Sequence, residues 1–352
     1  MGKSSKDKRD IYYRMAKVEG FRARSAYKLS QIFEETGIMC KYDDNTIRHF
    51  LLANCCEICS AAHEISSLQQ PHMAHTPELY TKIVDLCSAP GSWSQLVSEI
   101  VLEQHKQLLD IAKSLTRCNN SFCVNLQKYL DKPIVISVDL QEMAPLPNVH
   151  FIRGDITDQC VLQQVFNYFN TRSNVDNNNN SVSVSTDENM KADIVLCDGA
   201  PDVSGLHEVD GFIQSELIRF SLHMATQVLR LGGTYISKMF RTEKYPFIIS
   251  RIGFLFDKVQ VMKPSASRNS SVEAFIVAQG FKGNIENLSQ MLATPLVNPS
   301  QFEFRSQLNA ALVPFISCGD LSSFDSDRNY PLDDYQPLDP VQPPITAPYI
   351  KP

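Results

Sequence analysis

Four short apolar segments alternate with segments of helical periodicity, and this alternation constrains the fold more than any other feature. The apolar segments are 82–87 (KIVDLC), 134–140 (IVISVDL), 149–153 (VHFIR) and 192–197 (ADIVLC). Runs of this length that are rich in β-branched residues are typical of buried strands. Strands that alternate with helices predict an α/β fold, with a mostly parallel sheet covered by helices on both faces.

Three further strand patterns lie in the second half of the chain, at 234–240 (TYISKMF), 258–262 (KVQVM) and 274–279 (AFIVAQ). They bring the predicted sheet to seven strands. The last of these strands are expected to form an antiparallel edge on the otherwise parallel sheet.

Helical segments are predicted from the spacing of apolar residues. The first, within 24–34, has one apolar stripe, and Ser25 can serve as its N-cap. A second is expected over 92–100, and a third over 212–231, where Gly232-Gly233 forms a suitable C-cap. The stripe of the first helix consists of Ala26, Leu29, Ile32 and Phe33.

Three stretches interrupt this rhythm, at about 41–80, 103–131 and 171–191, and the last contains a polar low-complexity run. Beyond residue 285 the apolar periodicity fades, and the chain ends in a proline-rich segment without a core of its own. We therefore expect one folded domain over 1–284 with three insertions, followed by a C-terminal extension over 285–352.

Charge is distributed unevenly along the chain. The whole chain of 352 residues carries a net charge of −6, yet residues 1–28 hold nine basic side chains against three acidic ones. A basic segment on an acidic chain suggests a local phosphate-binding face, although a solvated amphipathic helix would look similar. No apolar run is long enough to span a membrane and the first residues lack a secretory signal, so a cytosolic or nuclear location is expected.

Polar residues follow the predicted strands at the points where parallel strands would present a ligand. DLCSAPGSW at 85–93 brings backbone N–H groups and Gly91 to the carboxyl edge of the sheet. The dinucleotide fingerprint G-x-G-x-x-G is absent, which disfavours a nicotinamide or flavin enzyme. Asp139 is placed to accept hydrogen bonds from a ribose diol, Asp155 could receive an adenine amino group, and Asp198 lies at the same edge. Each aspartate alone could instead cap a helix.

Two lysines and two carboxylates have unusual sequence environments. Lys238 lies inside an apolar strand, Glu273 adjoins another, Lys28 is on the first helix and Asp198 ends its strand. Lysine and glutamate are seldom buried without a partner. If the four converge, burial and the second lysine would lower the pKa of Lys238. The alternative is a pair of interior salt bridges without catalytic use.

A zinc site is a weaker hypothesis. Cys56, Cys59, His72 and His75 approach a two-Cys, two-His spacing, with Cys55 and His63 nearby. The separation of the two histidines is one residue short, so we expect no metal.

The motifs taken together resemble the FtsJ/RrmJ-like ribose 2'-O-methyltransferases, and most of all their eukaryotic cytoplasmic tRNA members, which modify the anticodon loop. The resemblance covers nearly the whole chain except the three interruptions and the last residues. The segments that carry it are 6–29, 85–95 (DLCSAPGSWSQ), 138–147 (VDLQEMAPLP), 154–157 (GDIT), 197–210 (CDGAPDVSGLHEVD), 237–241 (SKMFR), 263–280 and 313–332.

This resemblance implies a Rossmann-like fold that uses S-adenosylmethionine to methylate a ribose 2'-OH in the tRNA anticodon loop. It implies a separate auxiliary protein that selects the target nucleotide. Because the whole chain is acidic, we expect weak tRNA binding without that partner. Ribosomal RNA or an mRNA cap is the alternative substrate, and a catalytically silent RNA-binding scaffold is the alternative class. The implied catalytic tetrad is Lys28, Asp198, Lys238 and Glu273, with Lys238 as proton acceptor. The implied cofactor positions are Gly91, Trp93, Asp139, Asp155 and Asp198, with the Trp93 ring as a pocket wall.

Overall fold

The computed structural model describes residues 10–53, 79–115, 131–175, 191–201, 204–242, 245–268 and 270–283. The chain divides into two units, 1–313 and 314–352, and every described residue lies in the first. Within the described residues no helix is both long and apolar enough to cross a membrane.

The described strands form one seven-stranded sheet, as the apolar patterns predict. Its order is β3-β2-β1-β4-β5-β7-β6, and β7 alone runs antiparallel to its neighbours. The predicted antiparallel edge is therefore confirmed. The strands are β1 (Lys82–Leu86), β2 (Ile134–Asp139), β3 (Val149–Arg153), β4 (Ala192–Cys197), β5 (Leu229–Phe240), β6 (Phe256–Met262) and β7 (Glu273–Phe281).

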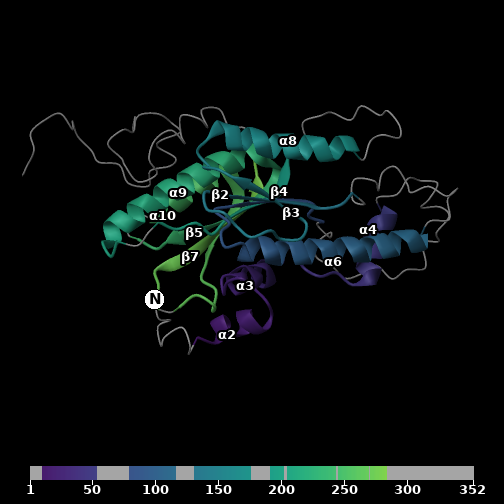
Figure 1. Ribbon diagram of the computed structural model, residues 1–352, viewed down its shortest axis with the longest axis horizontal. Coiled ribbons are helices and arrows are strands. Elements are labelled where there is room, and N and C mark those ends of the chain that lie inside the picture. Colours follow the sequence, from purple (N-terminus) through teal and green to yellow (C-terminus); the bar gives the residue numbers. More distant parts are fainter. Residues whose placement is uncertain are drawn as a thin grey trace, which may run out of the picture. The chain divides into compact units, whose positions relative to one another are not determined.

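Helices cover both faces of this sheet (Figure 1). One face packs against α8, α9 and α10, and the other against α3 and α6. The described helices are α2 (Ile11–Val18), α3 (Ala26–Thr36), α4 (Asp44–Ala53), α6 (Ser92–Leu115), α8 (Gln159–Val175), α9 (His207–Val228) and α10 (Tyr245–Leu255).

The alternation of side chains along β1 shows how one strand serves both layers. Val84 and Leu86 join the core under α8, α9 and α10, whereas Ile83 joins the core under α3 and α6. Successive strand residues point to opposite faces, so a strand that is apolar throughout is the expected centre of such a sheet. The predicted stripe of α3 is buried in full.

Two of the expected interruptions contain helices that pack together. α6 continues to Leu115 instead of ending near Ile100, and so takes in the first part of the stretch at 103–131. α4 lies within the stretch at 41–80 and contacts α6 through Ile47, Leu51 and Leu108. The helical periodicity of 103–115 was therefore missed, and these two segments add a small core of their own.

Two local expectations at helix ends are corrected. α9 ends at Val228, three residues early, and Gly232-Gly233 lie inside β5 instead of capping a helix. The register of β4 against β5 shifts at this point, and the φ of +73° at Gly232 accommodates the irregularity. Ser25 precedes α3, but its side chain makes no capping hydrogen bond.

Candidate active site

Parallel pairing brings the ends of β1, β2, β3 and β4 to one edge of the sheet. The residues at these ends are the loop at 87–91 after β1, Asp139 as the last residue of β2, Asp155 after β3 and Asp198 after β4. The predicted gathering of these groups at one edge is therefore what the topology produces. β5 ends at the same edge because it is parallel to β4.

The four residues of the charged cluster, Lys28, Asp198, Lys238 and Glu273, come from four elements that converge here. β4 and β5 pair Cys197 with Ser237, which brings Asp198 alongside Lys238. β7 runs the other way, so its first residue, Glu273, reaches this edge and lies opposite Phe240. Glu273 and Lys238 are consequently diagonal neighbours on one face of the sheet, and α3 brings Lys28 over that face.

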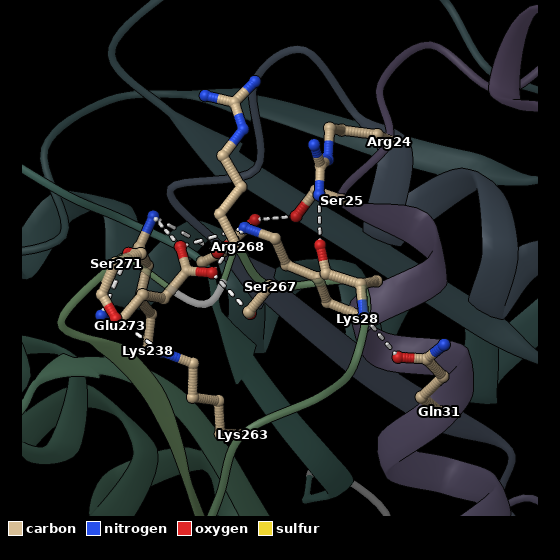
Figure 2. A network of polar contacts seen from close by, with 12 residues as sticks. Arg24, Ser25, Lys28, Gln31, Lys238, Lys263, Ser267, Arg268, Ser271 and Glu273 are labelled. Carbon is tan, nitrogen blue, oxygen red and sulfur yellow. Dashed lines mark hydrogen bonds and ion pairs between the residues drawn. The ribbon is translucent and has the colours of Figure 1, made fainter. Parts of the chain in front are cut away.

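Glu273 is the centre of the cluster, and both lysines pair with it (Figure 2). Lys28 Nζ lies 2.7 Å from Oε1 and 2.9 Å from Oε2 of this carboxylate. Lys238 Nζ lies 3.0 Å from Oε2 of Glu273 and 3.7 Å from Oδ1 of Asp198. The four side chains are between 10% and 19% exposed, so the charges face one another more than they face water.

The charge states within the cluster follow from this pairing. Burial alone would raise the pKa of Glu273, but Lys28 and Lys238, with a hydrogen bond from Ser267, lower it to about 2. Burial alone would lower the pKa of Lys238, yet Asp198 and Glu273 outweigh it and raise that pKa above its ordinary value. The expectation that burial and Lys28 keep Lys238 neutral is therefore wrong for this state, because the charges of two neighbouring carboxylates favour the ammonium form.

Asp198 has a different balance. Burial raises its pKa, and the charges of Lys238 and Lys28 with a hydrogen bond from Ser25 offset that rise only in part. No hydrogen-bond donor among the described residues reaches its Oδ1. This oxygen is a buried acceptor with unused capacity, facing Lys238 across 3.7 Å.

Three polar residues that the sequence analysis did not assign to the site hold this cluster in place. Ser267 donates to Glu273 Oε1 at 2.7 Å, and the Ser25 hydroxyl donates to Asp198 Oδ2. Gln214 on α9 donates to the backbone oxygens of Gly199 at 3.2 Å and Lys238 at 2.9 Å, which ties the ends of β4 and β5 together. Gln214 is buried, but it is followed directly by Ser215 and Glu216, so its neighbours in the sequence gave no signal for this role.

The loop at 87–91 is held by neighbouring backbone and side chains. Asp139 Oδ2 accepts a hydrogen bond from the backbone N–H of Ala89 at 2.8 Å. The Arg22 guanidinium donates to the carbonyl oxygens of Pro90 at 3.1 Å, Ala144 at 2.8 Å and Pro145 at 2.8 Å. The N-terminal basic segment is thus joined to the loops after β1 and β2.

Gly91 lies at a position where any side chain would be strained. Its φ is +98°, and a Cβ added there would lie 2.4 Å from Met143 Sδ and 3.1 Å from Leu146 Cδ1. The loop backbone therefore needs glycine both for its conformation and for the close approach of its surroundings.

The aspartates after β2 and β3 do not cap helices. Asp139 Oδ1 accepts from the backbone N–H of Gln141 at 2.8 Å, and Asp155 Oδ1 accepts from that of Thr157 at 2.8 Å. α8 is capped instead by Asp158, whose Oδ1 accepts from the N–H of Cys160. Each carboxylate retains acceptor capacity for hydroxyl or amino donors. With the glycine loop and the unused Oδ1 of Asp198, these residues fit a nucleoside-bearing cofactor.

Trp93 corrects one expectation. Its indole is 1% exposed and lies in the core beneath α3 and α6, 5.7 Å from the Phe275 ring. Its Nε1 donates to the backbone oxygen of Ser25 at 3.0 Å and to the Ser25 hydroxyl at 3.1 Å. The side chain is therefore not a pocket wall, and it supports the site from below.

The Cys/His pattern weighed as a zinc site, Cys55, Cys56, Cys59, His63, His72 and His75, lies outside the described residues. In the part of the chain that the structure does describe, no group of three or more His, Cys, Asp or Glu side chains is arranged to hold a metal ion.

Comparisons with known proteins agree with the resemblance inferred from the motifs. A "tRNA (cytidine(32)/guanosine(34)-2'-O)-methyltransferase" of Mus musculus is 37% identical, over 99% of this chain and 85% of the relative. Its Schizosaccharomyces pombe counterpart is 32% identical, over 99% and 95%. An "AdoMet-dependent rRNA methyltransferase" of Eremothecium gossypii is 33% identical, over 80% of this chain but 24% of the relative. Residues 21–281 match the family model described as "FtsJ-like methyltransferase", and the chain therefore belongs to the FtsJ-like methyltransferase family.

Proposed function

We propose that this methyltransferase transfers a methyl group from S-adenosylmethionine to the ribose 2'-OH of nucleotides in the tRNA anticodon loop. The observation that carries the proposal is the charged cluster at the edge where β4, β5 and β7 meet, beside the glycine loop. The mouse and fission yeast relatives, which match nearly the whole chain, carry tRNA 2'-O-methyltransferase names and support the choice of substrate.

S-adenosylmethionine would supply an electrophilic methyl group on a positively charged sulfur. Gly91 would allow close approach of the loop backbone, and Asp139 and Asp155 would accept hydrogen bonds from the ribose hydroxyls and the adenine amino group. Asp198 adjoins both this group of residues and the charged cluster. Trp93 would act only by supporting the loop and α3 from the core.

Lys238 is the residue that we assign as proton acceptor for the 2'-OH. Its raised pKa means that the resting side chain is an ammonium, so the amine form is a minor species near neutral pH. The lysine must therefore release a proton before it can take one from the ribose, and turnover depends on the small fraction that has done so.

The other three residues of the cluster orient the two lysines. Glu273, which stays ionised down to about pH 2, fixes Lys28 and Lys238 side by side at a single carboxylate. Asp198 forms a second ion pair with Lys238, at 3.7 Å. Lys28 would add positive potential at the position where a ribose oxygen gains negative charge.

Substrate RNA would approach from the basic N-terminal segment. Lys17 on α2 and Arg241 after β5 are exposed. Arg22 and Lys28, which follow Lys17 in the sequence, are partly buried. Phosphate contacts of this kind give affinity that falls with salt, and unpaired loop nucleotides are the RNA elements most accessible to enzymes. With a net charge of −6, the chain alone is expected to bind tRNA weakly and to rely on an auxiliary protein subunit. We propose that it acts in the cytoplasm.

The decisive experiment compares the ribose methylation map of tRNA from cells with and without this chain. Loss of methyl groups confined to the anticodon loop is expected. Loss in ribosomal RNA instead, which the Eremothecium gossypii relative makes the second candidate, or in mRNA caps would overturn the choice of substrate. A single-turnover assay with purified tRNA, cofactor and chain separates an enzyme from a silent RNA-binding scaffold.

A further inference from the structure

Ser25 occupies a position between the core and the charged cluster. It immediately precedes α3, so it lies one helical turn before Lys28. Its hydroxyl donates to Asp198 Oδ2, while Trp93 Nε1 donates to both the hydroxyl and the backbone oxygen of Ser25. The serine thus joins a core aromatic residue to a carboxylate of the cluster (Figure 2 shows Ser25 beside the cluster).

The direction of these hydrogen bonds is fixed by chemistry. An indole N–H can only donate, so the Ser25 oxygen must accept from Trp93. The one hydrogen of the hydroxyl is then available to Asp198, which can only accept when it is ionised. With Oδ2 held by Ser25, the carboxylate leaves Oδ1 facing Lys238.

Among the described residues, the Ser25 hydroxyl makes no hydrogen bond other than those with Asp198 and Trp93. Ser25 stands where an N-cap would be, but its backbone has helical φ and ψ of −62° and −24°, and its side chain makes no capping bond to α3. Removing the hydroxyl therefore leaves the helix start unchanged and removes only the contacts with Asp198 and Trp93.

We propose that Ser25 is a positioning residue that holds Asp198 ionised and turned toward Lys238, with Trp93 fixing the serine in turn. This inference rests on the proposed function, because Asp198 has its assigned role only within the methyl-transfer site. Ser25 itself does not touch the reacting atoms. Its effect on the reaction passes through the carboxylate.

The surroundings of Asp198 make its ionised form sensitive to a single hydrogen bond. Burial disfavours the charge, and the Ser25 hydroxyl is one of the few groups that favour it. Without that hydroxyl the pKa of Asp198 moves further up, so the ionised fraction falls first at acid pH. The charged or titratable groups that face Asp198 are Lys28, Asp85, Cys197, Lys238 and Glu273.

The kinetic experiment compares Ser25→Ala, Ser25→Thr and Ser30→Ala with the unmodified chain in single-turnover methyl transfer across pH. Ser30 lies on the same helix, and its hydroxyl donates to Glu34 at 3.0 Å in a solvent-exposed contact, which makes it the matched control. Loss of a hydrogen bond to a charged group predicts a rate lower by roughly 10- to 100-fold in Ser25→Ala. The loss should be largest at acid pH, with KM for tRNA unchanged and Ser25→Thr restoring the rate.

A second measurement reads Asp198 without any turnover. Trp93 is the single tryptophan of the chain, so tryptophan fluorescence comes only from the side chain that donates to Ser25. We expect an acid-pH fluorescence transition that is kept in Ser30→Ala and is absent both in Asp198→Asn and in Ser25→Ala, where the link between Trp93 and Asp198 is broken.

Each outcome decides the matter. A Ser25→Ala variant whose rate and pH profile match those of Ser30→Ala overturns the proposal, and so does an equal loss at every pH, which would mark a merely structural role. If the unmodified chain methylates no RNA, the proposed function fails, and the fluorescence transition alone then decides whether Ser25 controls Asp198.

Discussion

The active edge of the sheet has two halves that are built in different ways. In the half formed by β1, β2 and β3, a glycine loop and two carboxylates are held mainly by backbone hydrogen bonds. In the half formed by β4, β5 and β7, charged side chains are held by one another, and serine hydroxyls orient the carboxylates. The first half suits recognition of a ligand by shape, whereas the second concentrates charge where the proposed mechanism moves a proton.

Lys238→Ala should give the largest effect, because it should reduce methyl transfer, assigned to the charged half, without changing cofactor affinity, assigned to the other half. Removal of a proton acceptor lowers a rate by about 100- to 10,000-fold, and we expect this loss in single-turnover methyl transfer. Affinity for S-adenosylhomocysteine, measured by calorimetry, should be unchanged. Lys258→Ala, an exposed lysine on β6 of the same sheet, is the control. Near-normal turnover in Lys238→Ala would remove this lysine from the mechanism.

Gly91→Ala should give the opposite pattern. The added Cβ would lie 2.4 Å from Met143 Sδ at a φ of +98°, so either the Met143 side chain or the loop must shift. Overpacking costs about 1–3 kcal/mol and a left-handed conformation about 1–2 kcal/mol, so we expect affinity for S-adenosylhomocysteine to fall about 100-fold. Gly253→Ala is the matched control, since nothing lies within 4 Å of its added Cβ. Equal affinities in the two variants would contradict the role given to the loop.

Glu273→Gln tests how far the charged half also stabilises the fold. The pKa of Glu273 is lowered from 4.5 to about 2, so its contribution is present above about pH 4.5 and is lost as the pH falls through 2. We expect the free energy of unfolding at pH 7 to drop by about 3 kcal/mol, with the difference from the unmodified chain vanishing at low pH. Glu142→Gln, at an exposed ion pair with Arg153, should change little in the same denaturation series.

The pH dependence of the unmodified enzyme tests the role assigned to Lys238 in the charged half. The pKa of Lys238 is raised above 10.5. At any pH below its pKa, the amine fraction therefore rises about tenfold for each unit by which the pH increases. The single-turnover rate should rise in step and should not level off in the neutral range. A plateau reached near pH 7 would mean that another group accepts the proton.

Much of this architecture could be predicted from the order of residues alone. Apolar runs with acids at their ends place Asp139, Asp155 and Asp198 at one edge, because parallel strands share a direction. The convergence of Lys28 and Glu273 required more, namely the reversal of β7, which the antiparallel-edge prediction supplied.

What could not be predicted depends on distances and on local packing. The charge state of Lys238 is decided by a carboxylate 3.0 Å away, and the sequence shows which residues are charged without showing how near they stand. The role of Ser25 was missed for a similar reason. A serine before a helix is a common N-cap, and only the fold reveals that its hydroxyl turns to Asp198 instead.

The reversal of β7 has a mechanical consequence. The parallel strands reach the active edge with their last residues. β7 runs the other way, so its first residue, Glu273, lies at this edge and is positioned by the connection between β6 and β7. That connection contacts α2 and α3. The Ser265 hydroxyl lies 3.1 Å from the Tyr12 hydroxyl on α2, and the Ala266 N–H donates to Gln31 on α3 at 2.8 Å. Any tilt of α2 or α3 is therefore conveyed through a few residues to the one carboxylate that both lysines share.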